Sequence, residues 1–326
     1  MSSLTDAIAW CSNLDLLKSY EDIYFEPIVG DAGFREYMRI RTPNINYILV
    51  YAPPTSEKNQ QFIDLANAWR LADINTPYVH QYDLTQGFLL LSDLGSTRLY
   101  DRKGIDSYKI YLAAIDELLK IQQLGTQETS VPIYDKSLIA AEVELFIDWF
   151  LIKHLNIPLT QAERAMFQHI IADLQDVFTN STQVVVQRDF HSKNLLLDKQ
   201  DNIGVVDFQD AVIGPVSYDL VSLLKDCYVK LPTPDIERLL AYYISQAAVK
   251  NIIPLSHTEL FIEEFHMIGL QRHLKAIGIF ARLAIRDNKP VYLESIPLTL
   301  DYIVNNLAES AIYPDLLNFL QDLIVA

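Results

Sequence analysis

Three oxygen-bearing side chains stand close together in the second half of the chain. Asp189 and Asn194 lie five residues apart, just ahead of the apolar run 195–197, and Asp207 ends a second apolar run, 203–206. Two short apolar runs joined by a polar turn are typical of a β-hairpin. We therefore expect a hairpin with Asp189 and Asn194 before its first strand and Asp207 after its second, so that all three meet at one end.

Phosphoryl transfer from a nucleotide needs this set of groups. One Asp orients the attacking hydroxyl and accepts its proton, while an Asn and a second Asp hold the magnesium ion that neutralises the phosphates. We assign Asp189 as the catalytic base, Asn194 and Asp207 as metal ligands, and ATP and Mg²⁺ as cofactors. A single Asp or Asn before an apolar run is usually a cap or turn residue. Three at this spacing, flanked by strands, favour the phosphoryl-transfer interpretation.

The pattern R-D-x-x-x-x-N of kinases matches residues 188–194, and Asp207-Phe208-Gln209 stands where protein kinases carry D-F-G. Gln209 replaces the Gly of that motif, and His191 stands where protein kinases usually have Lys. The stretch therefore resembles the aminoglycoside-phosphotransferase-like small-molecule kinases. A protein kinase is disfavoured, because nothing after Asp207 resembles an activation segment that ends in Ala-Pro-Glu.

Several short sequence motifs, spread over roughly residues 30–283, are similar to those of the bacterial anomeric N-acetylmuramate/N-acetylglucosamine kinases of cell-wall recycling. They are 31–35, 52–54, 87–95, 188–194, 207–211, 218–223 and 271–274. The resemblance implies ATP- and Mg-dependent phosphorylation of the anomeric hydroxyl of N-acetylmuramate, N-acetylglucosamine or both. The 1-phosphate product would then pass to a sugar-1-phosphate nucleotidyltransferase and return to peptidoglycan precursors.

The expected fold is α+β, a two-lobed protein-kinase-like architecture. A small antiparallel β-sheet N-lobe, residues 1–94, would cover the nucleotide, and a larger, mainly helical C-lobe, residues 95–326, would carry the catalytic and acceptor-binding groups. Apolar residues at three- and four-residue spacing predict the helices of both lobes. These are 4–17, 57–71, 106–123, 138–155, 161–177, 217–228, 234–249, 256–286 with a break, and two closing helices from 297 on.

The first predicted hairpin carries candidate phosphate-binding residues. Gly30 and Gly33 lie in its turn, where kinase-like folds place a loop over the phosphates, although an ordinary turn is the commoner reason for two glycines. Arg35 and Arg39 would share one face of the following strand. We expect one or both to bind phosphate, with a solvated sheet face as the alternative.

The predicted third strand, 46–51, has no basic residue. Kinases usually carry there a Lys that pairs with a Glu and holds the phosphates. Its absence puts that pair in doubt and directs attention to Arg39. The strand 88–91 leads into a short polar exit that suits a hinge between lobes, so we expect backbone groups near Leu91 and Asp93 to bind adenine.

Polar residues around the central stretch are candidates for binding the acceptor. They are His191, Gln209, Asp210, Gln271 and Arg272, for which a polar helix face is the alternative. Lys193 would approach the moving phosphoryl group. Asp219 begins an apolar helix, and kinase-like folds use an Asp there to prop the catalytic loop through its backbone.

The composition narrows the class of protein. The chain has 326 residues, of which 42 are acidic and 26 basic, giving a net charge of -16. So acidic a chain argues against nucleic acid and anionic membranes as partners. Cys11 and Cys227 match no metal-binding spacing, and no signal peptide or membrane-spanning run is evident. We expect a cytoplasmic protein.

Two alternatives stay open at this point. One is a small-molecule kinase with another acceptor, such as an aminoglycoside, choline or homoserine. The other is a nucleotide-binding pseudokinase, suggested by the missing basic residue on the third strand.

Overall fold

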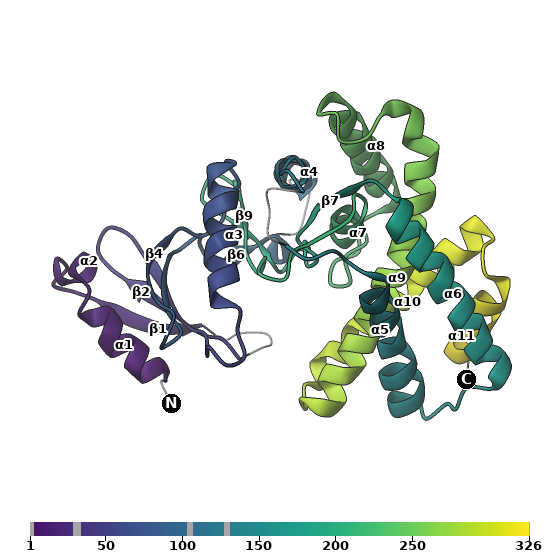
Figure 1. Cartoon of the computed structure of the whole chain (residues 1–326), viewed down its shortest axis with the longest axis horizontal. Helices are drawn as coiled ribbons and strands as arrows, with labels where there is room; N and C mark the ends of the chain where they lie inside the picture. The colour runs from purple at the N-terminus through teal and green to yellow at the C-terminus, as the bar shows by residue number, and fades with distance from the viewer. Residues whose placement is uncertain (1–2, 29–33, 103–106, 127–130, 326) are drawn as a thin grey trace. The chain divides into compact units, whose positions relative to one another are not determined.

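A computed structural model describes the chain except residues 1–2, 29–33, 103–106, 127–130 and 326 (Figure 1). The chain divides into two compact units. Unit 1 contains Met1–Leu99 and Leu195–Gln209, and unit 2 contains Tyr100–Asn194 and Asp210–Ala326. The nucleotide-covering role of 1–94 and the acceptor-binding role of 95–326 stay predictions.

Unit 1 is built on an antiparallel sheet with the strand order β1-β2-β3-β5-β4. The strands are β1 (Tyr24–Ile28), β2 (Glu36–Arg41), β3 (Tyr47–Tyr51), β4 (Val79–Asp83) and β5 (Phe88–Ser92). Alternate residues of β2, β3 and β5 are buried on one face, and Val50, Leu89 and Leu91 are buried on the other, so both faces of the central strands are covered. The antiparallel N-terminal sheet predicted from the sequence is confirmed.

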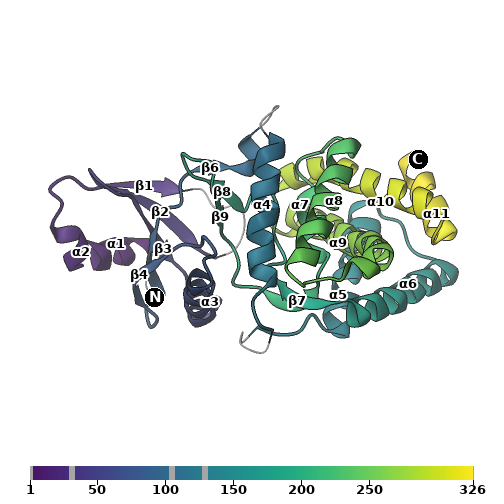
Figure 2. The same cartoon turned by 90° about the horizontal axis from the view of Figure 1, so that it is seen from above.

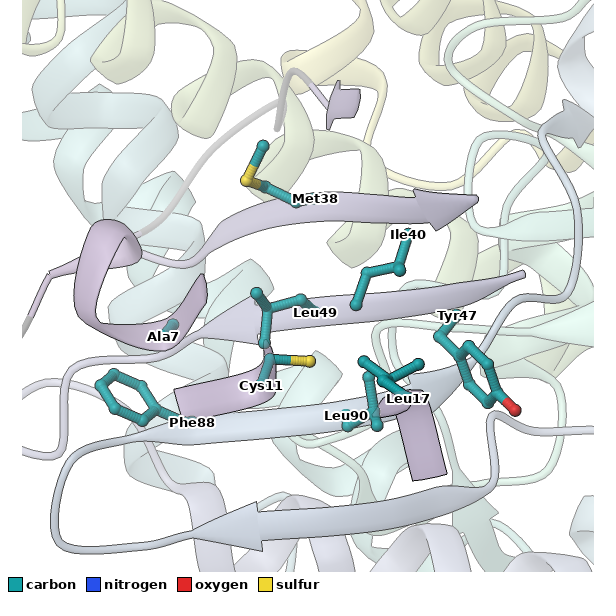
Figure 3. Close-up of a cluster of buried hydrophobic side chains, with 9 residues drawn as sticks. All are labelled: Ala7, Cys11, Leu17, Met38, Ile40, Tyr47, Leu49, Phe88 and Leu90. Carbon is teal, nitrogen blue, oxygen red and sulfur yellow. The ribbon is translucent and has the colours of Figure 1, made fainter. Parts of the chain in front are cut away.

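Two short helices, α1 (Leu4–Ser12) and α2 (Asp15–Lys18), pack on the sheet and form a hydrophobic core with β2, β3 and β5. Figure 3 shows the cluster, which consists of Ala7, Cys11, Leu17, Met38, Ile40, Tyr47, Leu49, Phe88 and Leu90. The single helix predicted for 4–17 is interrupted. The side-chain amide of Asn13 donates to the Ala9 carbonyl (2.8 Å), and Leu14 takes an extended conformation. Asn competes with the helical backbone in this way, so the first helix ends there.

The central hairpin is present in unit 1. It consists of β8 (Leu195–Leu197) and β9 (Ile203–Val205), and β6 (Thr97–Arg98) pairs with β8. The Asp198 carboxylate closes the turn by accepting the backbone N–H groups of Gln200 (2.8 Å) and Asn202 (2.9 Å). The helix α3 (Asn59–Leu71) contributes Phe62 and Trp69 to the interior of the same unit.

Unit 2 is mainly helical, as predicted (Figures 1 and 2). Its long helices are α4 (Ser107–Gln122), α5 (Lys136–Leu145), α6 (Gln161–Asn180), α8 (Thr233–Val249), α9 (Thr258–Arg286), α10 (Ile296–Ser310) and α11 (Pro314–Val325). Shorter elements are β7 (Gln183–Val186), which pairs with β10 (Val212–Pro215), α7 (Tyr218–Leu224), η3 (Leu255–His257) and η4 (Pro290–Ser295). The segment η1 (Leu99–Asp101) stands where the first part of unit 1 ends and unit 2 begins.

The helix α9 organises unit 2, since α5, α6, α7 and α10 all pack against it. The break predicted within 256–286 is absent, since α9 is continuous from Thr258 to Arg286 and most of its residues from Ile268 to Leu283 are buried. The predicted helix 138–155 instead changes at Phe146 into a π-helix, η2 (Phe146–His154). At that junction Gly278 of α9 lies so close that an added Cβ would stand 2.4 Å from the Leu145 carbonyl carbon.

Membrane spans are not found in the described part of the chain. Within residues 3–28, 34–102, 107–126 and 131–325, none of the helices combines the length and the apolarity needed to cross a bilayer.

We predict that Gly278→Ala destabilises the protein by about 1–3 kcal/mol, because the new methyl group meets backbone that cannot yield easily. Gly269→Ala, in the same helix, is the control. Among the described residues its Cβ would meet the Val221 side chain alone, at 3.6 Å. Ala favours a helix over Gly by about 1 kcal/mol, so the variant should be neutral or stabilised. Urea unfolding measures both free energies. Equal effects of the two substitutions would contradict the close helix contact.

Candidate functional site

The loop between β7 and residue 194 carries the predicted catalytic base. The buried residues Val184–Val186 of β7 lead into this loop. Within the loop, Arg188 has a positive φ of 79°. That conformation is rare for a residue with a Cβ and must be held by its surroundings. The Asp219 carboxylate does so by accepting the backbone N–H groups of Gln187 (2.6 Å) and Arg188 (3.0 Å).

Asp219 lies in the first turn of α7 and is fully buried. Burial raises its pKa to about 7, since the loss of water outweighs the two N–H donors that favour the charged form.

A second carboxylate, Asp226, fixes the other end of the loop. It accepts the backbone N–H of Ser192 (2.8 Å) and that of Tyr228 (2.8 Å). Within the loop, the Asn194 side-chain amide donates to the Asp189 carbonyl (3.1 Å). The backbone of residues 187–194 is therefore tied at both ends to the segment 219–228.

Asp189 lines a pocket in unit 2 that has a volume of about 80 Å³, room for several water-sized groups. Three cationic side chains, Arg188, Arg272 and Lys275, line the same pocket. Burial alone would raise the pKa of Asp189. The charges of Lys275, His191, Arg188 and Arg272 outweigh burial and hold the pKa below its usual value. Asp189 is therefore ionised at neutral pH, as a proton acceptor must be.

A buried carboxylate, Glu142, compensates the charges of two of these cations. Glu142 of α5 pairs with Arg188 (2.6 Å) and Lys275 (3.3 Å) and accepts a hydrogen bond from the Gln271 amide (2.9 Å). Burial would raise the pKa of Glu142, but the charges of Lys275 and Arg188 hold it below its usual value. Gln271, predicted to bind the acceptor, thus contacts Glu142 and does not line the pocket, whereas His191 and Arg272 line it.

Asp207 belongs to unit 1 and follows β9 with a φ of 61°. Phe208 anchors it, because this fully buried ring packs on Phe62 (5.0 Å between centroids) and Trp69 (5.1 Å) of α3. The amide of Gln209 donates to the Asp207 carboxylate (2.8 Å). Since Asp189 and Asn194 belong to unit 2, convergence of the three residues on one cation stays a prediction.

The two arginines of the first hairpin have different partners. Arg39 donates to both carboxylate oxygens of Asp93 (2.7 and 3.2 Å) and to the Gly95 carbonyl (3.0 Å). Arg35 pairs with Glu57 (2.9 Å between Nε and Oε2), and its side chain is 8 % exposed. Among the described residues, no acceptor is in hydrogen-bonding position for the buried Arg35 Nη2.

Other predicted residues lie as follows. Gly30 and Gly33 fall outside the described residues. Leu91 lies in β5, between β3 and β4, and Asp93 follows that strand and holds Arg39. Asp210 is exposed in unit 2 and does not line the pocket.

The sequence analysis did not identify several residues of these clusters, among them Asp226, Lys275, Glu142 and Glu57. Lys275 follows Arg272 by three positions, the spacing that places two side chains on one face of a helix. Glu142 is a charge on the apolar face formed by Ile139, Val143 and their neighbours, which is a usable sign of a buried ion pair. Glu57 lies just outside α3 and carries no such local signal.

Comparison with known proteins adds to this geometry. Residues 25–251, more than half of the chain, match the model of the phosphotransferase enzyme family. The chain belongs to this family.

Its relatives include the N-acetylmuramate/N-acetylglucosamine kinases of Pseudomonas putida, 39 % identical over 84 % of this chain and 80 % of the relative, and of Neisseria meningitidis, 35 % identical over 84 % and 83 %. Among solved structures, a choline kinase from Streptococcus pneumoniae matches with a TM-score of 0.64 at 14 % identity, covering 93 % of this chain and 100 % of the other. The GDP complex of aminoglycoside 2'-phosphotransferase-IIIa matches with a TM-score of 0.59 at 17 % identity, covering 93 % and 99 %. These structures confirm the kinase-like fold.

Proposed function

We propose that this phosphotransferase is an amino sugar kinase. It transfers the γ-phosphoryl group of ATP to the anomeric hydroxyl of N-acetylmuramate or N-acetylglucosamine and releases the sugar 1-phosphate and ADP. The observation that carries this proposal is the 35–39 % identity, over more than four fifths of the chain, to relatives named as kinases of these two sugars. The fold alone would not distinguish among acceptors.

Asp189 acts as the base in this reaction. The acceptor oxygen forms a bond to the γ-phosphorus, the bond from that phosphorus to the β-phosphate oxygen breaks, and the hydroxyl proton passes to the Asp189 carboxylate. The lowered pKa of Asp189 and its place in the pocket wall support this role. Asp219 keeps the loop in its strained conformation through the N–H groups of Gln187 and Arg188.

The cations of the pocket suit an uncharged or anionic acceptor. Arg272, Lys275 and His191 offer donors for sugar hydroxyls, an acetamido carbonyl or the lactyl carboxylate of N-acetylmuramate. A cationic acceptor, such as choline or an aminoglycoside, would be repelled by Arg188, Arg272 and Lys275. Roles for Gln209, Asp210 and Gln271 in acceptor binding stay predictions.

Asn194 and Asp207 would hold Mg²⁺, and their oxygen atoms are the ligands that this ion prefers. The nitrogen of the Asn194 amide donates to the Asp189 carbonyl, which orients the amide. In the described residues, no cluster of three or more His, Cys, Asp or Glu forms a metal site. Magnesium usually takes few ligands from protein and the rest from phosphate and water. The bound ion would neutralise the phosphate charge.

Arg35 is the better of the two arginine candidates for the ATP phosphates. Arg39 already donates through Nε and Nη2 to Asp93 and Gly95, whereas buried Arg35 has a nitrogen without an acceptor in the described residues. Glu57 holds the Arg35 guanidinium, so the pair would replace the missing Lys–Glu pair. Gly30, Gly33 and the backbone near Leu91 and Asp93 remain candidates for the rest of the nucleotide.

The product defines the next step of the pathway. A sugar 1-phosphate is the substrate of a nucleotidyltransferase, so we expect such an enzyme to consume it. The cytoplasmic location expected from the sequence stays a prediction.

We expect phosphorus NMR of a mixture of protein, magnesium-ATP and N-acetylmuramate to show ADP and phosphate on carbon one of the sugar. The same assay with choline and with an aminoglycoside should show no phosphorylated acceptor. A product phosphorylated elsewhere on the sugar would refute the regiochemistry. Turnover of choline or the aminoglycoside alone would refute the acceptor class.

Asp189→Asn should lower kcat by about 10²- to 10⁴-fold, because the base is lost. The KM for ATP should change little. Asp176→Asn is the control, since this Asp is 70 % exposed and paired only with Lys136 among the ion pairs found. Steady-state kinetics of both variants test the assignment, and near-normal turnover of Asp189→Asn would remove Asp189 as the base.

Arg35→Met should raise the KM for ATP by roughly tenfold or more, since a charge-assisted contact to phosphate contributes about 1.5–3 kcal/mol. The KM for the sugar should stay nearly constant. Arg41→Met provides the matched control, because Arg41 also pairs with a Glu, Glu26, but at an exposed position (48 % and 53 %). If both variants keep the normal KM for ATP, Arg35 does not bind the nucleotide.

A further inference from the structure

The ammonium group of Lys193 lies among three tyrosine rings of unit 2. It stands 3.8 Å from the ring centroid of Tyr228, 5.6 Å from that of Tyr100 and 5.8 Å from that of Tyr292. The rings come from η1, from the segment after α7 and from η4. The face of an aromatic ring attracts a cation within about 6 Å. Three distant segments of the chain thus form a cage around one ammonium group.

The rings of this tyrosine cage are held by contacts of their own. Phe280 packs on Tyr228 (5.8 Å) and on Tyr292 (6.0 Å, 20° between the planes), and His191 meets Tyr228 edge-on (5.2 Å). The backbone N–H of Tyr228 donates to Asp226 (2.8 Å). Burial also raises the pKa of Tyr228 well above its ordinary value, so this ring stays neutral. Contacts with other residues, and not Lys193 alone, therefore hold the tyrosine rings in place.

The tyrosine cage shares a wall with the pocket of Asp189. Tyr228, Phe280 and His191 line that pocket. A ligand in the pocket therefore contacts Tyr228, one of the three rings that surround Lys193.

We propose that Lys193 fills a cation-binding cage that shares Tyr228 with the acceptor pocket, and that it thereby excludes organic ammonium ions from this cage. Aromatic cages of this kind recognise quaternary ammonium ligands. An ammonium group tethered to the same chain has a high effective concentration and displaces a free ligand of the same chemistry. Lys193 is thus a residue that determines specificity by occupying a competing site.

The idea that the excluded ammonium ion would otherwise be an acceptor rests on the proposed function. The tyrosine cage itself does not depend on that function. The cage adds to the repulsion by Arg188, Arg272 and Lys275. An uncharged acetamido sugar does not compete for it, because such a sugar carries no cation.

Binding of tetramethylammonium, measured by titration calorimetry without ATP or sugar, tests the proposal. We expect Lys193→Ala to bind this ion roughly tenfold or more tightly than the unmodified protein. Replacing Tyr228 by Leu in the Lys193→Ala protein should abolish the gain. Lys153→Ala is the control. Its ammonium also lies over a ring, that of Trp149 (3.4 Å), but the described structure shows no second ring over that ammonium. This variant should gain nothing.

Equal affinity of the folded Lys193→Ala variant and the unmodified protein would overturn the proposal. A second measurement does not depend on that variant. In the unmodified protein, the ε-methylene NMR signal of Lys193, assigned with Lys193→Arg, should be shifted upfield by the ring currents. A signal at the position of the exposed lysines would equally overturn the cage. Neither experiment uses phosphoryl transfer, so failure of the kinase proposal would be seen separately, in the product assay.

Discussion

The catalytic region of unit 2 depends on the ion pairs that the buried carboxylate of Glu142 makes with Arg188 and Lys275. Two cations beside Asp189 could not be buried without a counter-charge, because removing ions from water costs several kcal/mol each. Glu142 provides this charge through its contacts with Arg188 and Lys275. Since Tyr134 and Gln271 also donate to it, the carboxylate is satisfied on both oxygens. The pocket can therefore be cationic while Asp189 remains ionised within it.

Backbone strain stands at two of the functional positions. Arg188 and Asp207 both take a positive φ, and each is next to a group that fixes it. For Arg188 that group is a carboxylate that binds two consecutive N–H groups, and for Asp207 it is the buried ring of the following residue. Strain of this kind persists only where the surroundings define the conformation fully. One unit uses electrostatics and the other uses apolar packing for the same purpose.

Local patterns made most of the fold predictable, and long-range partners did not. The apolar runs around residue 200 gave the hairpin, and helical spacing gave the main helices of unit 2, because both signals lie within one segment. The resemblance to small-molecule kinases supplied the architecture. By contrast, the pairing of Glu142 with Lys275 joins residues far apart in the chain, and so does that of Arg39 with Asp93. Such pairs form through long-range packing, so the sequence of any single segment does not reveal them.

The position of Asp207 is set by a cluster of buried aromatic rings. Phe208 fixes the neighbouring carboxylate only while Phe62 and Trp69 keep their places. If Asp207 binds the cation as proposed, damage to this apolar cluster would look like poor metal affinity. A genetic screen for lost activity would then score Trp69, a fully buried indole, alongside the residues that touch substrate.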